Sequence, residues 1–187
     1  MVNIILSFLI LFLNSTFLAQ EYRVDKNGNN KVTFISETTL ESFEGVSNKI
    51  DGYLALESFE KFITSKLYFE VDLNTLDTGI GLRNRHMREN YLETDKYRYA
   101  FYEGKLSDIK LIKGDEYFIE SDGMMFIHGV NKKIKVAGKL NINDEGWLLS
   151  SEFSILLSDY NIEIPKVMFM KLNNKVQVKL SINLKKL

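Results

Sequence analysis

The sequence predicts an all-β protein of about eight antiparallel strands. Apolar and polar residues alternate with a period of two along much of 21–187. Gly- and Asn-rich turns of hairpin length separate the alternating runs. Only 82–95 is rich in good helix formers and lacks alternation, which predicts one short helix or a long irregular connection. Eight such strands must close into a barrel or stack as a sandwich to bury their apolar faces.

The first twenty residues form a separate segment. Residues 1–20 carry no charged side chain and are apolar from 4 to 13 except for Ser7, whereas the stretch that follows, 21–31, is rich in charged and polar residues. This pattern is typical of a secretory signal peptide, because the apolar run is too short for a comfortable membrane span. An uncleaved N-terminal anchor is the alternative. We expect one domain at 21–187, periplasmic or secreted after the segment is removed.

The strands are expected in eight successive segments. Alternation is clearest at 66–73, 133–142 and 175–184. A region at 158–166, which holds the only proline, interrupts the pattern near the C-terminus. The five weaker strand candidates are 31–38, 46–57, 97–106, 116–127 and 147–157.

The apolar set of each strand is expected to face the interior, because a one-residue shift would expose all of it. An eight-stranded barrel is either filled by side chains or holds one small ligand. Whatever enters this interior should be apolar. The residues assigned to the lumen are Phe34, Ile50, Leu54, Leu67, Phe69, Val71, Ala100, Tyr102, Val136, Leu140, Val178 and Leu180.

Composition leaves little catalytic equipment. Cysteine is absent, which excludes disulfides, thiolate metal sites and cysteine nucleophiles, and two histidines cannot form a His-rich metal cage. A net charge of −1 argues against a nucleic-acid partner. The carboxylate pairs Asp72/Asp77 and Asp144/Glu145 are interpreted as turn caps rather than as a hydrolase dyad. We therefore expect no catalytic residue, no metal and no cofactor.

Two histidine-containing segments have alternative interpretations. His86 lies among Arg83, Arg85 and Arg88, which suits a phosphate or carboxylate site at a barrel mouth. The favoured interpretation is a capping segment whose charges pair with the carboxylates at 89, 93 and 95. His128 lies where a strand meets a turn, and a buried histidine that fixes the turn is favoured over a metal ligand.

Four ordered motifs resemble the YceI-like family of small secreted bacterial proteins. They are FEVDLNTLDTG at 69–79, RNRHMRENYLE at 83–93, KYRYAFYEG at 96–104 and GMMFIHGVNKKI at 123–134. The resemblance implies an eight-stranded, lipocalin-like antiparallel barrel with a helix at its side and an isoprenoid chain, such as a polyprenyl or quinone tail, in the lumen. The family's usual Arg-x-Asp-Phe-Gly strand signature is missing near 157–161, where the chain reads LSDYN.

Two functions follow as hypotheses. The first is non-enzymatic binding or carriage of an apolar, isoprenoid lipid. The alternative is a ligand-free structural or stress-related extracytoplasmic barrel. Membrane contact is expected to be transient at most, and a homodimer is left open.

Overall fold

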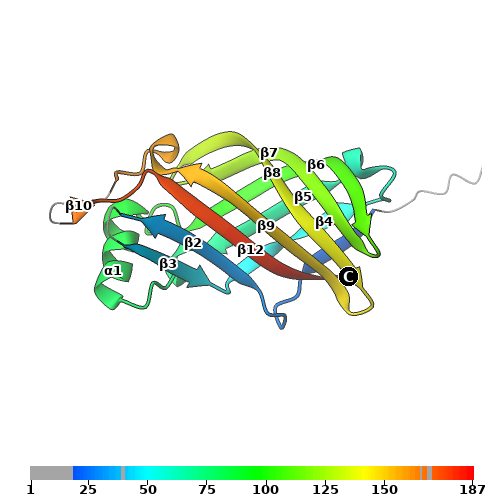
Figure 1. The fold of residues 1–187 in the computed structure, drawn as a ribbon, viewed down its shortest axis with the longest axis horizontal. Helices are drawn as coiled ribbons and strands as arrows, with labels where there is room; N and C mark the ends of the chain where they lie inside the picture. Colours follow the sequence, from blue (N-terminus) through cyan, green and yellow to red (C-terminus); the bar gives the residue numbers. More distant parts are fainter. Residues whose placement is uncertain (1–18, 39–40, 165, 168–169) are drawn as a thin grey trace, which may run out of the picture.

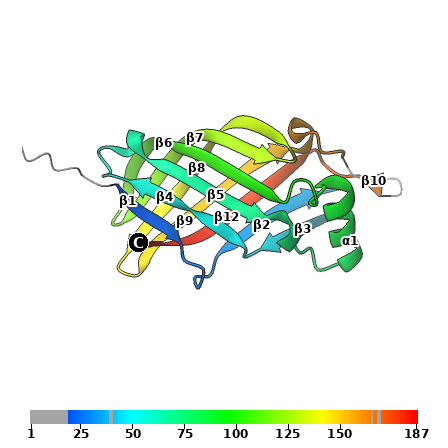
Figure 2. The same cartoon turned by 180° about the vertical axis from the view of Figure 1, so that it is seen from behind.

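The protein is an eight-stranded antiparallel closed barrel with one short helix, as predicted (Figures 1 and 2). The computed structural model describes residues 19–38, 41–164, 166–167 and 170–187. The expected signal peptide lies outside the described residues as far as residue 18. Within the described part of the chain, no helix is long and apolar enough to cross a membrane.

Ten strand segments occupy the eight positions of the barrel. Their order in the sheet is β1-β4-β5-β6-β7-β8-β9-β12-β2-β3, and the pairing of β1 with β12 closes the ring. The segments are β1 (Gln20–Val24), β2 (Lys31–Glu37), β3 (Ser42–Ser47), β4 (Ile50–Leu56), β5 (Lys66–Asp72), β6 (Tyr99–Lys113), β7 (Glu116–Ile127), β8 (Val130–Asn143), β9 (Gly146–Leu156) and β12 (Lys175–Lys186).

Two positions are each shared by two segments. β1 and β2 both pair with β12 along one edge, and β3 and β4 follow them on the next position. A turn at 25–30 separates β1 from β2. The side chain of Asn30 bridges this turn, since its Nδ2 donates to the Asp25 carbonyl at 2.6 Å and its Oδ1 accepts from the Asn183 amide at 2.8 Å. β1 is not among the strands predicted from the sequence, and its first residue, Gln20, falls in the segment assigned to the signal peptide.

One end of the barrel is filled by side chains. Leu54, Leu106, Leu140 and Ile182 are fully buried there. Trp147 closes the layer by stacking on Tyr22 with 3.5 Å between ring centroids. This packed end, which we call the closed end, lies on the side of the chain's C-terminus (Figure 1).

Tyr102 bounds the next layer of the interior. Its hydroxyl donates to Ser121 Oγ at 2.9 Å. Its ring lies over the paired glycines Gly104 and Gly123, where an added Cβ would come within 2.8 Å of the tyrosine side chain. The two glycines therefore make the room that lets a large aromatic ring lie within the barrel, and burial raises the pKa of the Tyr102 hydroxyl.

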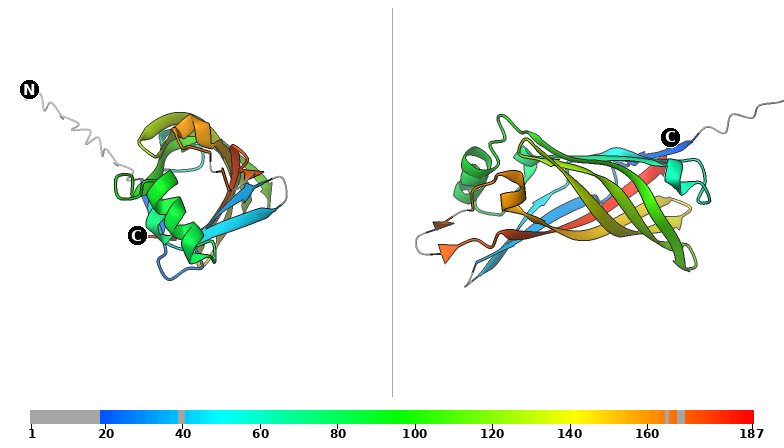
Figure 3. Two further views of the ribbon diagram at one scale, coloured as in Figure 1. Left: turned by 90° about the vertical axis from the view of Figure 1, so that its left-hand side faces the viewer. Right: turned by 90° about the horizontal axis from the view of Figure 1, so that it is seen from above.

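The other end carries the helix. α1 (Gly81–His86) and the following π-helical turn η3 (Met87–Tyr91) lie across the rim of the barrel (Figure 3). The predicted helix within 82–95 is thus present. Five shorter elements remain in the described part of the chain. They are η1 (Phe62–Thr64) near the closed end, η2 (Leu73–Thr75), η4 (Leu157–Tyr160), and the strands β10 (Lys166–Val167) and β11 (Met170–Lys171), which form a small hairpin at the helix end.

Candidate binding cavity

The helix end of the barrel contains a cavity of about 710 Å³. This volume falls within the range of small-molecule sites, roughly 300–1,000 Å³. Its deep part is bounded by Ile50, Phe69 and Tyr102, beyond which the closed end begins. Its outer part reaches α1 and η3. The interior therefore has one filled half and one hollow half.

Eight of the twelve predicted lumen residues line this cavity. They come from β2, β4, β5, β6 and β12, and their inward phase agrees with the alternation of the sequence. Whether any of them contacts a ligand stays a prediction. The eight are Phe34, Ile50, Phe69, Val71, Ala100, Tyr102, Val178 and Leu180.

The other four predicted residues do not line the cavity. Leu54, Leu67 and Leu140 belong to the packed cluster of the closed end. Val136 packs against the cluster that contains Tyr102 and is not among the residues that line the cavity. All four lie on strands, and the sequence placed them on the apolar face, but period-two alternation specifies a face and not a depth along the barrel axis.

The wall also includes residues outside the predicted lumen set. Phe43 of β3, Phe153 and Ile155 of β9, Met125 and Ile127 of β7, and Leu157 and Ile162 around η4 all line the cavity. The residues of β7 and β9 continue the alternation of the predicted strands 116–127 and 147–157, whereas Phe43 lies between the predicted strands 31–38 and 46–57. No local feature of the sequence predicts that the helical segment and the residue after it cross a barrel end, so four lining residues were not predictable: Leu82, Met87, Tyr91 and Leu92.

Polar groups are few in the wall and gather toward the helix end. Thr38 and Glu41 flank the β2–β3 turn, and Arg83 and His86 come from α1. Ser36 is 2% exposed, and its hydroxyl has no hydrogen-bond partner. A hydroxyl buried without a partner is costly, so a ligand or water that offers a polar atom beside Ser36 would be stabilised.

Arg83 is fixed in place by neutral partners. Its Nε donates to Thr78 Oγ1 at 2.9 Å, its Nη2 donates to the Thr78 carbonyl at 2.7 Å, and its guanidinium lies over the Phe43 ring, 4.2 Å from the centroid. The expected pairing with carboxylates at 89, 93 and 95 is therefore not what holds this arginine. The carboxylate of Glu93 instead binds Lys96 and His128.

His128 joins three parts of the helix end. Its Nδ1 lies 3.0 Å from the Tyr160 carbonyl of η4, and its Nε2 lies 3.1 Å from Glu93 Oε2 just after η3. The ring packs edge-on against Tyr97. The residue itself has φ of 49° at the β7–β8 turn. The interpretation of His128 as a histidine that fixes a turn agrees with this geometry, and the imidazole also ties two cavity-bordering segments together.

Comparison with known proteins identifies the family. Residues 22–184 match the YceI-like domain. The chain belongs to the YceI-like family. It is 26% identical over 162 residues to protein YceI of Salmonella newport (strain SL254), covering 82% of each chain.

Solved structures share the barrel. BcnA of Burkholderia cenocepacia superposes with a TM-score of 0.69 at 20% identity, covering 85% of this chain and 98% of that one. A polyisoprenoid binding domain from Saccharophagus degradans, implicated in plant cell wall breakdown, gives 0.70 at 16% identity, covering 91% and 99%. The YceI protein of Campylobacter jejuni gives 0.58 at 12% identity, covering 80% and 87%. At these identities the likeness concerns the fold.

The first two YceI-like motifs, 69–79 and 83–93, are joined by side-chain hydrogen bonds in the structure. Thr78 and Asp77, from the turn after η2, form hydrogen bonds with Asn84 of α1. The Thr78 amide and hydroxyl donate to Asn84 Oδ1 at 2.9 and 2.6 Å. Asn84 Nδ2 donates to Asp77 Oδ1 at 2.7 Å. Hydrogen bonds from Asn84 and from the Gly79 amide lower the pKa of Asp77. The main chain of Asp77 bridges Val46 of β3, so the motif pair fastens the helix to the barrel rim.

The other two YceI-like motifs also meet. Gly129 has φ of 78°, and a Cβ there would lie 2.7 Å from the Tyr97 ring. Glycine is therefore required twice at this turn, by backbone conformation and by the close aromatic neighbour. With Tyr97 also packed on His128, the third motif buttresses the turn that the fourth motif makes.

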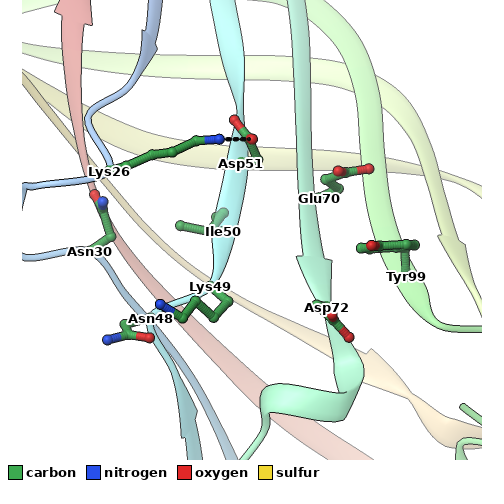
Figure 4. Close-up of a pocket in the computed structure, with 9 residues that line it drawn as sticks. All are labelled: Lys26, Asn30, Asn48, Lys49, Ile50, Asp51, Glu70, Asp72 and Tyr99. Carbon is green, nitrogen blue, oxygen red and sulfur yellow. Dashed lines mark ion pairs between the residues drawn. The ribbon is translucent and has the colours of Figure 1, made fainter.

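A second, polar hollow lies outside the barrel (Figure 4). It measures about 260 Å³, and its walls include Lys26, Asp51, Glu70 and Asp72. Lys26 pairs with Asp51 at 2.9 Å, which together with other hydrogen bonds lowers the pKa of that carboxyl. Asp72 is engaged by Arg98 at 2.7 Å and accepts from the Asn74 amide. Asp51 and Asp72 are thus occupied with ion pairs and turn capping, as predicted from the sequence for Asp72, and Glu70 accepts a hydrogen bond from the Tyr68 hydroxyl at 2.6 Å.

No group of three or more His, Asp or Glu in the described part of the chain is arranged to hold a metal ion.

His128→Gln is expected to destabilise this YceI-like barrel by about 1–3 kcal/mol, because glutamine cannot reach both acceptors and leaves a largely buried carbonyl unpaired. Hydrogen exchange should accelerate at 157–162 and at 91–94 while the closed end stays protected. Lys96→Ala is the matched control, since it removes the other partner of Glu93 at an exposed position. An equal rise in exchange in both variants would contradict the role given to His128.

The same site has a pH dependence. Hydrogen bonds, first from Lys96 and then from His128, lower the pKa of Glu93. A carboxyl whose folded-state pKa is lowered contributes its stability above the unfolded-state pKa, and this contribution is lost as pH falls through the folded value. Exchange at 157–162 should therefore rise in acid, and it should rise less in Glu93→Gln.

Proposed function

We propose that this protein binds or carries an apolar, isoprenoid lipid of the polyprenyl or quinone type in the barrel cavity, without catalysing a reaction. The observation that carries the proposal is the hollow half of the barrel, with its largely apolar wall and its opening at the helix end. The YceI-like family and the polyisoprenoid binding domain with the same fold support apolar ligand binding.

The physical chemistry of the wall favours selection by shape. Its aliphatic and aromatic side chains offer dispersion and desolvation but little hydrogen bonding. Each buried methylene contributes roughly 0.8 kcal/mol, so ten would contribute about 8 kcal/mol before the costs of association. A flexible prenyl chain could thus be held without any charged contact.

The alternative is a ligand-free structural barrel, which would favour a fully packed interior. Large side chains do fill the closed end. They stop at the layer of Phe69 and Tyr102, and small residues such as Ala100 occur in the wall beyond it. This unfilled half supports carriage over a purely structural role.

Mass spectrometry of an organic extract from purified mature protein tests the proposal. We expect an apolar molecule with a repeating five-carbon mass pattern. Titration with a prenyl quinone or a prenyl alcohol should saturate. The readout should be displacement of an environment-sensitive apolar dye, because Trp147 lies at the closed end, away from the cavity. If no apolar molecule is extracted and no saturable binding is seen, the carriage proposal fails and the ligand-free structural barrel is favoured instead.

Neutralising Arg83, Arg85 and Arg88 together to glutamine should distinguish head groups. An uncharged prenyl alcohol should bind with little change, because its tail supplies the affinity. A prenyl phosphate should bind about tenfold more weakly if these guanidiniums face its head group, since a charge-assisted hydrogen bond contributes about 1.5–3 kcal/mol. Equal losses for both lipids, with an unchanged circular dichroism spectrum, would contradict this.

We also propose that the mature protein is periplasmic or secreted, on the basis of the uncharged N-terminal segment. Intact-mass analysis of protein exported by a Gram-negative host should give a chain beginning near residue 20. Recovery of the full-length chain in the membrane fraction would support the anchor instead.

A further inference from the structure

The apolar lining of the cavity continues onto the outside of the protein at α1. Ile80 and Leu82 both line the cavity, yet they are 53% and 54% exposed. Eight other large hydrophobic side chains in the described part of the chain are between 38% and 78% exposed, and none of them lines the cavity. An apolar path thus leads from the lumen to solvent across this rim.

Basic side chains flank this path. Leu82, Arg85 and His86 have the i, i+3, i+4 spacing that places residues on one face of a helix, and all three are exposed. Arg83 and Arg88 extend the basic character along the same segment, in which Glu89 is the one carboxylate between 81 and 91. Arginine stems lie along apolar surface while their charged ends stay in water.

An exposed apolar pair beside arginines fits a particular surface. Large apolar side chains insert at the boundary between head groups and acyl chains, and each basic side chain near an anionic leaflet adds attraction. Water is a poor reservoir for a long prenyl lipid, so a carrier must meet its cargo in a bilayer. The rim is where such a cargo would leave the bilayer and enter the cavity.

We propose that the helix end docks transiently on an anionic lipid bilayer, with Ile80 and Leu82 entering the interface and Arg85 contacting lipid phosphates. This inference rests on the proposed lipid-carrying function. Two apolar side chains and a few charges give weak, reversible binding. The barrel axis is then perpendicular to the membrane surface. The cavity opens toward the acyl chains, and the closed end lies in water.

Co-sedimentation with vesicles tests the docking. The full mature chain is mixed with phosphatidylcholine vesicles that contain, or lack, about one third phosphatidylglycerol. We expect binding to the anionic vesicles that weakens as salt rises. Leu82→Asp should reduce it about tenfold, and Arg85→Glu about fivefold. The matched control is Ile63→Asp, since Ile63 is 63% exposed on η1 near the closed end and should bind like the wild type.

A second measurement separates docking from cargo binding. Delivering a prenyl alcohol from cyclodextrin bypasses the bilayer. Arg85 does not line the cavity, so the Arg85→Glu variant should bind the alcohol from cyclodextrin like the wild type. The same variant should take the alcohol up from anionic vesicles more slowly than the wild type. Vesicle binding that survives Leu82→Asp, or that falls equally in Ile63→Asp, overturns the docking proposal. The docking proposal is also overturned if the wild-type protein is a dimer that does not bind vesicles and the Leu82→Asp variant is a monomer. Failure to bind the prenyl alcohol from cyclodextrin overturns the proposed function instead.

Discussion

Leu140→Ala is expected to lower the free energy of unfolding by about 2–5 kcal/mol, the usual cost of truncating a buried leucine. Leu140 is fully buried in the closed end and lies opposite Tyr117 and Leu149 on the neighbouring strands. The ladder on both sides holds the backbone in place, so the wall cannot collapse into the space that the side chain leaves. Urea or thermal melts measure the loss.

Val178→Ala is the matched comparison on the hollow half. Val178 already borders the cavity, so its truncation widens an existing space instead of creating an enclosed void. We expect a loss below about 1 kcal/mol, which is at the low end for removing buried methyl groups. Equal losses at the two positions would mean that the hollow half is packed in solution, which would also count against the binding proposal.

The inward or outward direction of strand side chains was predictable, because alternation assigns each residue of a strand to one face of the sheet. Val71 and Val178 line the interior, whereas Glu70 and Lys179 lie on the outside, as the alternation requires. Depth was not predictable in the same way. Leu67 and Val71 have the same pattern on β5, but only the second reaches the cavity.

The outward face of the barrel carries aromatic as well as charged side chains. Outward positions of the strands include charged residues such as Glu103, Lys105 and Lys179, which are exposed. An aromatic row also crosses the outside of neighbouring strands, in which Phe101 and Phe126 stack at 4.7 Å and Tyr53 and Tyr68 at 6.2 Å. Cross-strand pairing of this kind depends on register, which alternation within one strand does not specify.

The helix end was the least predictable part. The segment 82–95 lacks strand alternation, and its contacts with His128 come from a residue remote in the chain. His128 reaches Glu93, 35 positions away, and the Tyr160 carbonyl, 32 positions away. Arg83 binds Thr78 instead of the nearby carboxylates, because the turn at 77–79 presents a hydroxyl and a carbonyl in the right place.

Ala100→Trp is expected to remove most of the affinity for a long prenyl lipid while preserving the fold. Ala100 lines the cavity and pairs with Val71 across β5 and β6. An indole at this position would project into the hollow half and displace several methylenes of a bound chain. At roughly 0.8 kcal/mol for each, losing three would weaken binding about fiftyfold.

Stability and chain length decide whether this loss has the proposed cause. Overpacking usually costs about 1–3 kcal/mol, and the space beside Ala100 should keep the cost near the lower figure. A short prenyl alcohol should lose less affinity than a long one, because it does not need the blocked volume. Lys105→Trp places the same ring on the exposed face of β6 and should bind like the wild type. Unchanged affinity for the long lipid in a folded Ala100→Trp variant would place the ligand outside the cavity and contradict the lumen-carrier mechanism.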